Sequence, residues 1–226
     1  MKSFIKSVTS DVLFAVEFLG IVTLIFLLAY LAEKWLQKRQ GNKGKVFTTR
    51  KVAMIGMFAA ISTILIILEM PVPFAPPFYK IDLSELPALI GGFAFGPVAS
   101  VMIEFCKILL KLITKGTSTA LVGEMANFVV SCSFVLPASF LYWLKKSKKS
   151  AIFSSIIGTL SMTIVGSWLN GLYLLPTFAT MYGMPLMPNG TGVSIVEMGT
   201  KVNASITDVT TLVLFAVVPL NLIKGG

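Results

Sequence analysis

The chain contains more long apolar runs than a soluble fold can bury. An apolar helix needs about 20 residues to cross a hydrocarbon core about 30 Å thick. Five runs approach or exceed that length, and they cover about residues 12–31, 52–68, 98–113, 120–144 and 152–175. Two shorter runs cover about 83–95 and 209–223. The sequence therefore predicts an all-α integral membrane protein.

The composition excludes several other classes of protein. Of the 226 residues 55% are hydrophobic and 13% are charged, whereas a soluble domain is about 25% charged. Cys106 and Cys132 lie inside apolar runs and are interpreted as reduced core residues. The chain has no histidine, which removes the commonest general base and metal ligand. We therefore expect neither an enzyme nor a cofactor-binding protein.

The basic residues predict how the helices cross the membrane. Seven lysines and arginines lie in the segment 33–51, and four lysines lie in 145–149. Cytoplasmic loops carry an excess of such residues, so both segments should be cytoplasmic and the N-terminus outside. The proline-rich segment 71–77 and a long loop over 176–205 then face outward. The net charge of +9 is explained by cytoplasmic loops that face anionic lipid, and it does not indicate binding of nucleic acid.

Charged residues interrupt the run 98–113 on one side of the predicted helix. Glu104, Lys107 and Lys111 are spaced by three and four residues, which places them along one helical face. Each costs about 2.5–3.5 kcal/mol on insertion scales and normally faces a cavity. A polar cavity is therefore expected. The alternative is an internal pair of Glu104 with Lys107, with Lys111 extending to water.

Further polar residues lie near the predicted outer half of the bundle. These are Asn127, Asn170, Asn221 and Lys224, and we expect Glu104 to balance the charge of Lys224. For Glu124, a position at a helix start explains the carboxylate as well as a role in the cavity does. Phe74, with neighbouring aromatic residues, is expected to cover the cavity, although an interfacial aromatic belt is the alternative. Amides, amines and aromatic rings together favour a neutral, hydroxyl-rich, partly aromatic ligand.

Two motifs resemble a known family. The segment from Lys80 to Pro97, KIDLSELPALIGGFAFGP, and the segment from Val218 to Gly225, VPLNLIKG, are similar to the riboflavin-specific substrate-binding (S) components of energy-coupling factor (ECF) transporters. Gly158–Thr163 and Asn170 also fit that branch. The resemblance covers about residues 50–226.

The resemblance implies a six-helix bundle that binds riboflavin from outside the cell. It also implies a membrane coupling subunit and two cytoplasmic ATPases as partners. Asn221 and Lys224 match the ligand-binding residues of the family's last helix. Glu104 and Asn170 match polar ligands to the ribityl chain, and Asn127 is added from its position alone.

The expected organisation has two parts. Residues 1–50 form an additional transmembrane helix and basic linker, and residues 51–226 form the vitamin-binding domain. We expect the last helix to continue past residue 226. A small-residue pattern at Ala53, Gly56 and Ala60 lets helices approach closely and is assigned to docking of the coupling subunit.

Two other functions remain open at this point. One is an S component for another vitamin such as pantothenate, in which Lys107, Lys111 and Lys224 would bind a carboxylate. The other is a membrane-embedded lipid-modifying enzyme, although neither a metal motif nor a nucleophile with a base is visible.

Overall fold

The computed structural model describes residues 2–41, 46–117, 119, 121–188 and 193–225, with side chains from residue 16 onward. The described chain is mostly helical, which confirms the expected all-α membrane class. Its first six helices are α1 (Lys2–Arg39), α2 (Thr49–Ile67), α3 (Glu85–Phe95), α4 (Pro97–Lys115), α5 (Val122–Leu144) and α6 (Lys148–Leu169). Among the described residues, four helical segments are long and apolar enough to span a membrane, beginning at Val16, Thr49, Val122 and Lys148.

The second half of the chain contains two π-helical turns within longer helices. α6 continues through η1 (Asn170–Leu174) into α7 (Leu175–Met181), and α9 (Val209–Leu212) continues through η2 (Val213–Val217) into α10 (Val218–Gly225). A short helix, α8 (Ile195–Thr200), precedes α9. π-helical turns occur frequently at functional sites because they redirect side chains.

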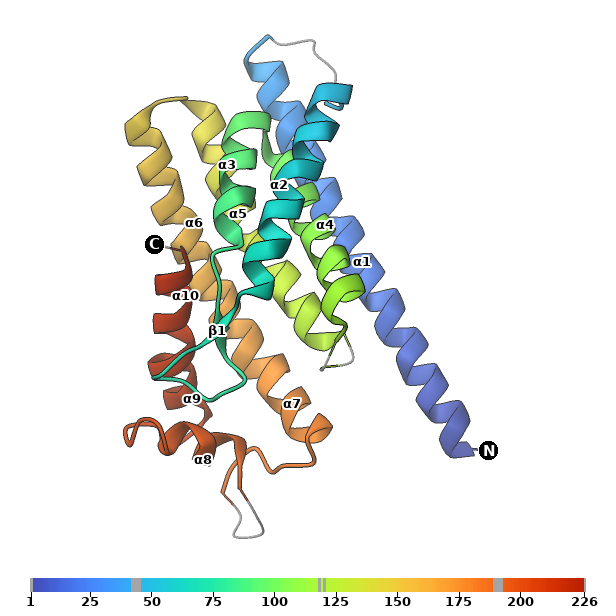
Figure 1. The fold of residues 1–226 in the computed structure, drawn as a ribbon, viewed down its shortest axis with the longest axis vertical. Helices are drawn as coiled ribbons and strands as arrows, with labels where there is room; N and C mark the ends of the chain where they lie inside the picture. Colours follow the sequence, from blue (N-terminus) through green and yellow to red (C-terminus); the bar gives the residue numbers. More distant parts are fainter. Residues whose placement is uncertain (1, 42–45, 118, 120, 189–192, 226) are drawn as a thin grey trace.

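The helices form an elongated bundle with α1 along one flank (Figure 1). α1 packs on α4 and α5, and α10 packs on α6. Between α2 and α3, the strands β1 (Met70–Pro71) and β2 (Lys80–Ile81) pair antiparallel, with Met70 opposite Ile81. The loop that they enclose lies beside α10 and α7 (Figure 1).

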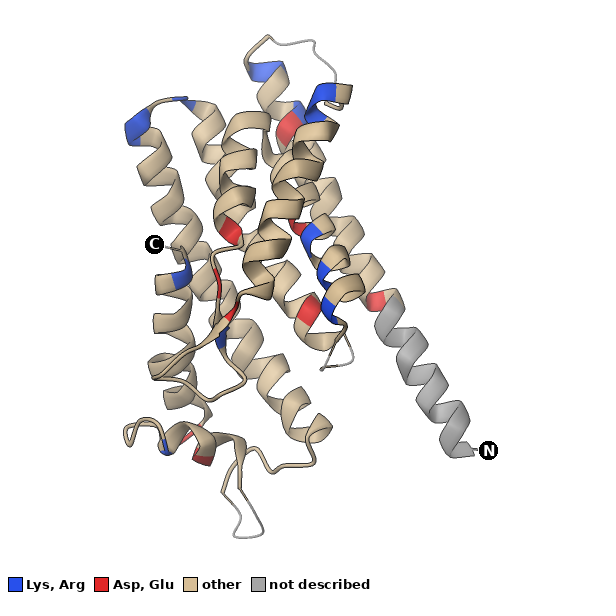
Figure 2. Ribbon diagram, in the orientation of Figure 1, with Lys and Arg blue, Asp and Glu red and all other residues tan. Residues whose placement is uncertain are grey.

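The two basic segments lie at the same end of the bundle. Figure 2 shows lysines and arginines at the α1–α2 and α5–α6 connections, while the β1–β2 loop and α8 lie toward the opposite end. This arrangement agrees with an even number of crossings between the basic segments. Which end faces the cytoplasm stays a prediction of the charge distribution.

Two expected boundaries are wrong. The first helix does not end near residue 31 but continues to Arg39, because Glu33 is ion-paired and Leu36 is buried in the bundle. The expected loop over 176–205 contains the end of α7 and all of α8. α8 begins with a capping box in which Ser194 and Glu197 satisfy each other's backbone N–H groups.

Small residues hold the central helices close together. The core around α3, α4 and α5 includes Ala88, Ala99 and Ala138 beside Phe134 and Met162. A Cβ at Gly158 of α6 would lie 2.8 Å from the backbone oxygen of Phe134, so only glycine permits this approach. The close contact of α5 and α6 therefore fixes the relative positions of the polar residues that these two helices contribute to the site.

Candidate functional site

A cavity of about 280 Å³ opens where the β1–β2 loop, α5, η1 and α10 meet. This volume is close to the lower end of the range for small-molecule sites, about 300–1,000 Å³. Its polar lining includes three amides and a lysine, namely Asn127, Asn170, Asn221 and Lys224. These residues come from three separate helices, so the tertiary fold creates one polar wall from distant parts of the sequence.

Aromatic side chains form another wall of the cavity. Phe78, Tyr79, Phe178 and Tyr182 all line it. The ring of Phe78 lies 4.6 Å from that of Tyr79 and 5.9 Å from that of Phe178, and the rings of Phe178 and Tyr182 are 6.0 Å apart. Tilted and edge-on contacts at such separations are favourable. The cavity therefore offers aromatic surface to a flat ring.

The two best-placed amides differ in how far their hydrogen bonds are already satisfied. Asn170 accepts a bond from the Tyr79 hydroxyl at 2.8 Å and donates to the Gly166 carbonyl at 2.7 Å. The buried Nδ2 of Asn221 has no hydrogen-bond partner. A buried unpaired donor is costly, so Asn221 has hydrogen-bonding capacity that the described fold leaves unused.

A set of five ionisable residues adjoins the cavity and is here called the buried cluster: Asp82 and Lys224, which line the cavity, and Glu85, Glu104 and Lys107, which lie behind them. Lys107 Nζ lies 2.5 Å from Glu104 Oε2 and 3.4 Å from Glu85 Oε1. Lys224 Nζ lies 2.9 Å from Glu85 Oε1 and 3.2 Å from Asp82 Oδ2. Glu85 therefore joins the lysine of α4 to the lysine of α10.

The expected pairing of Lys224 with Glu104 is wrong. Lys224 pairs with Asp82 and Glu85 at the start of α3, while Glu104 pairs with Lys107 on its own helix. The reason is geometric, since residues three apart on a helix are neighbours. Burial raises the pKa of the Asp82 carboxyl, but the charges of Lys224 and Lys107 and the hydrogen bonds from Ser84 outweigh it and hold that pKa well below its usual value.

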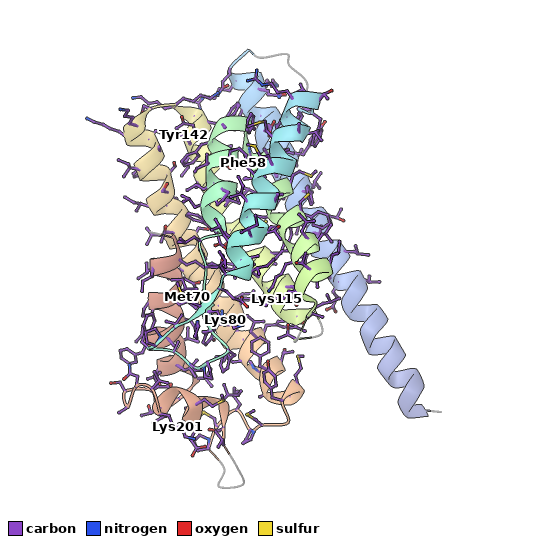
Figure 3. All side chains as sticks on the ribbon, in the orientation of Figure 1. Phe58, Met70, Lys80, Lys115, Tyr142 and Lys201 are labelled. Atoms are coloured by element: carbon purple, nitrogen blue, oxygen red, sulfur yellow. The ribbon has the colours of Figure 1, made fainter. Side chains whose placement is uncertain are left out.

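A second set of five, here called the rim cluster, lies where the cavity opens: Glu69, Lys80, Lys111, Lys115 and Glu124. Glu69 Oε1 lies 2.7 Å from Lys80 Nζ and 2.6 Å from Lys115 Nζ, and Figure 3 shows these two lysines at the same level of the bundle. Lys111 Nζ lies 3.6 Å from Glu124 Oε1. Burial raises the pKa of the Glu69 carboxyl, but its two lysines outweigh this and lower it.

The structure brings together most, but not all, of the residues singled out in the sequence. Asn127, Asn170, Asn221 and Lys224 line one cavity. Glu104 and Lys107 are fully buried behind it and are not part of its lining, so they match the internal pair that was the alternative. Phe74 packs on the apolar cluster around Tyr79 and Leu175 and is also outside the lining.

Asp82 and Glu85 are the important residues that the sequence reasoning did not assign to the site. Both belong to the motif that carries the family resemblance, yet acidic residues before an apolar helix are typical of a helix start. The neighbouring serines are a further signal: Ser131 Oγ donates to Glu85 at 2.7 Å, and Ser84 Oγ accepts from Lys107 at 3.0 Å. These two hydroxyls extend the ion pairs into a buried polar network.

Residues 50–226 match the family model described as "ECF transporter, substrate-specific component". The chain is 35% identical to the riboflavin transporter RibU of Staphylococcus aureus and 30% identical to the riboflavin transporter FmnP of Bacillus subtilis, in each case over 78% of this chain and over 82% and 84% of the relative.

A solved structure gives the same result at the level of the fold. It is described as the S component of a bacterial ECF transporter and is similar with a TM-score of 0.57 and 34% identity, over 78% of this chain and 86% of that one. The family consists of transporter subunits and not of enzymes. The chain therefore belongs to the substrate-specific components of ECF transporters.

Proposed function

We propose that this chain is the riboflavin-binding subunit of an ATP-driven vitamin importer in the cell membrane. Its relatives are riboflavin transporters, and its cavity combines an aromatic wall with a wall of amides. The flavin ring system is flat, with polar atoms along one edge, and the ribityl chain carries hydroxyls. Each part of this ligand finds matching chemistry in the cavity.

The observation that carries the proposal is the pairing of every lysine beside the cavity. The buried and rim clusters together contain five lysines and five carboxylates, and each of these lysines lies within 3.6 Å of a carboxylate oxygen. An anionic vitamin such as pantothenate would have to displace an internal partner from Lys107, Lys111 or Lys224. A neutral vitamin leaves all of these pairs intact, so the charges favour riboflavin.

Asn221, Asn127 and Lys224 are proposed as the main polar contacts of the ligand. The unpartnered Nδ2 of Asn221 supplies a donor, Asn127 supplies an amide, and Lys224 supplies the one N–H that remains beyond the two that bind Asp82 and Glu85. Asn170 uses one acceptor site for Tyr79 and one N–H for Gly166, which fixes the orientation of its amide and leaves a second N–H and a second acceptor site for the ligand.

We propose as partners the coupling subunit and two ATPases that family membership implies, with the ATPases supplying the energy. The proposed topology rests on the basic segments and has the N-terminus outside and 33–51 and 145–149 in the cytoplasm. Ala53, Gly56 and Ala60 are exposed on α2, and nothing lies within 4 Å of a Cβ added at Gly56. This flat strip is proposed as the docking face for the coupling subunit. Residues 51–226 are proposed as the vitamin-binding domain.

The proposed ligand is tested by titrating the purified chain in detergent with riboflavin and following its fluorescence. Binding quenches flavin fluorescence, and a preparation from flavin-rich medium is yellow. Pantothenate in hundredfold excess should not compete. A colourless protein that fails to quench riboflavin, or one that binds pantothenate instead, would disprove the assignment.

The proposed docking face is tested with Gly56→Leu. The substitution fits the folded chain but fills the flat strip, so riboflavin affinity should be unchanged while co-purification with the coupling subunit falls at least fivefold. Gly20→Leu on α1 is the matched control, because a Cβ there is equally free. Equal loss in both variants, or in neither, would place the interface elsewhere.

A further inference from the structure

The N-terminal helix α1 lies outside the family match, which begins at residue 50, and it is nevertheless closely integrated into the bundle. Its apolar inner face includes Val22, Ala29 and Leu36, which are all buried. The ring of Phe26 packs edge-on against Phe105 of α4 at 5.5 Å, and that of Trp35 lies 5.7 Å from Phe140 of α5. α1 therefore belongs to the same packed unit as the vitamin-binding helices.

The decisive residue of α1 is Glu33, which is only 2% exposed. Its Oε1 accepts a hydrogen bond from Lys51 Nζ of α2 at 2.6 Å, and its Oε2 accepts one from the backbone N–H of Val98 of α4 at 2.9 Å. One side chain thus connects three helices at the end of the bundle that carries the basic segments (Figure 2).

The contact with Val98 compensates for a missing cap. α4 begins with Gly96 and Pro97, and Gly96 has no side chain with which to cap the helix. A carboxylate at a helix N-terminus satisfies a free N–H and interacts favourably with the positive end of the helix dipole. A Cβ at Gly96, where φ is +103°, would lie 2.8 Å from Glu33 Oε2, so glycine at this position leaves room for the carboxylate.

A second contact links Gln40, the residue that directly follows α1, to the end of α5. Gln40 Nε2 donates to the Trp143 carbonyl at 2.6 Å, and Trp143 Nε1 donates in turn to the Gly92 carbonyl of α3 at 3.0 Å. Glu33 therefore contacts the N-terminal ends of α2 and α4. Gln40, directly after α1, contacts the C-terminal end of α5 and, through Trp143, that of α3.

We propose that Glu33 makes α1 a brace, in which it caps α4, neutralises Lys51 and so positions α2 for docking of the coupling subunit. Lys51 and Ala53 are two residues apart on α2 and lie on opposite faces, one buried and one exposed. α1 therefore fixes α2 from behind and leaves the docking face free. Glu33 is a positioning residue, and its link to docking rests on the function proposed above.

Amide hydrogen exchange on the purified full chain tests the brace directly. Glu33→Ala should raise exchange at Val98 and in the first turn of α2 at least tenfold. Lys34→Ala, a neighbouring change on the exposed side of α1, should change neither. Unchanged protection of Val98 in Glu33→Ala would overturn the proposal.

Two further variants separate the cap from the ion pair and remain informative if Glu33→Ala does not fold. Glu33→Gln retains an oxygen that accepts from Val98, so the Val98 amide stays protected while the first turn of α2 loosens. The charge exchange Glu33→Lys with Lys51→Glu should restore protection in α2 but not at Val98, because lysine cannot accept a hydrogen bond. Restoration at both sites would show that an ion pair alone suffices, and the capping role would be disproved.

The functional consequence is measured in the same variants. In Glu33→Gln, riboflavin affinity should stay within threefold of the unmodified chain, while co-purification with the coupling subunit falls at least threefold. Full co-purification would remove the link to docking. If the unmodified chain failed to bind riboflavin, the proposed ligand would be refuted, and the exchange measurements would still decide the brace.

Discussion

The buried cluster and the rim cluster are built from the same two kinds of group, lysine and carboxylate, in different surroundings. The side chains of the buried cluster are at most 10% exposed, whereas Lys80 and Lys115 of the rim cluster are 43% and 40% exposed. Water screens the two pairs that Lys80 and Lys115 form with Glu69, so these pairs contribute little to stability. In the buried cluster the loss of one partner leaves a charge without water or counter-ion.

This contrast also separates two roles. The buried cluster links α3, α4 and α10 and contributes Asp82 and Lys224 to the cavity lining, so it helps to determine the shape of the cavity. The rim cluster connects the β1–β2 loop to the ends of α4 and α5 and determines mainly the charge that an approaching ligand meets. The following predictions test this division, from the largest expected effect to the smallest.

Glu85→Ala should have the largest effect on stability. Glu85 is shared by Lys107 and Lys224, so its removal weakens the pairing of two buried lysines and should cost about 3–5 kcal/mol. Thermal unfolding in detergent measures this loss. Leu86→Ala, on the exposed face of α3, is the control, and equal effects of the two changes would mean that the buried cluster contributes no special stability.

Asn221→Ala and Lys224→Ala should weaken riboflavin binding by about 1–3 kcal/mol each, because each removes hydrogen bonds to the ligand. Fluorescence quenching gives the Kd, and unfolding of the ligand-free variants separates affinity from stability. Ile223→Ala changes an exposed side chain between them and should leave the Kd unchanged. Wild-type affinity in both variants would remove these residues from the site.

Lys115→Ala should cost less than about 1 kcal/mol of stability, since the lysine is partly exposed and Glu69 retains Lys80. The remaining effect should shrink further in 1 M salt, where screening is strong. Unfolding temperatures at low and high salt provide the measurement. A loss as large as that of Glu85→Ala would contradict the distinction between the two clusters.

The last prediction is that pH has no effect: the contribution of Asp82 to stability should not change across the physiological range. The pKa of Asp82 is held below its ordinary value of 3.8, so its stabilising contribution is complete above that value and is lost only as the pH falls further. The difference in unfolding temperature between the unmodified chain and Asp82→Asn should therefore be constant from pH 8 to pH 5. A difference that already shrinks in this interval would show that Lys224 does not hold the Asp82 charge.

Some properties were readable from the sequence because they depend on local order along the chain. Apolar runs of about 20 residues determine membrane helices, the basic segments 33–51 and 145–149 determine which connections share one end, and the spacing of Glu104 and Lys107 determines that they are neighbours. The last-helix motif identified Asn221 and Lys224, which do line the cavity.

Only the tertiary structure decided which distant groups meet. Nothing local indicates that Glu85 joins Lys107 to Lys224, that Tyr79 donates a hydrogen bond to Asn170, or that Glu33 caps a helix 65 residues later. The physical reason is that a buried charge accepts whichever partner the packing brings within about 3 Å, and packing depends on the shapes of all the helices together. The sequence therefore specified the groups that need partners, and the fold selected the partners.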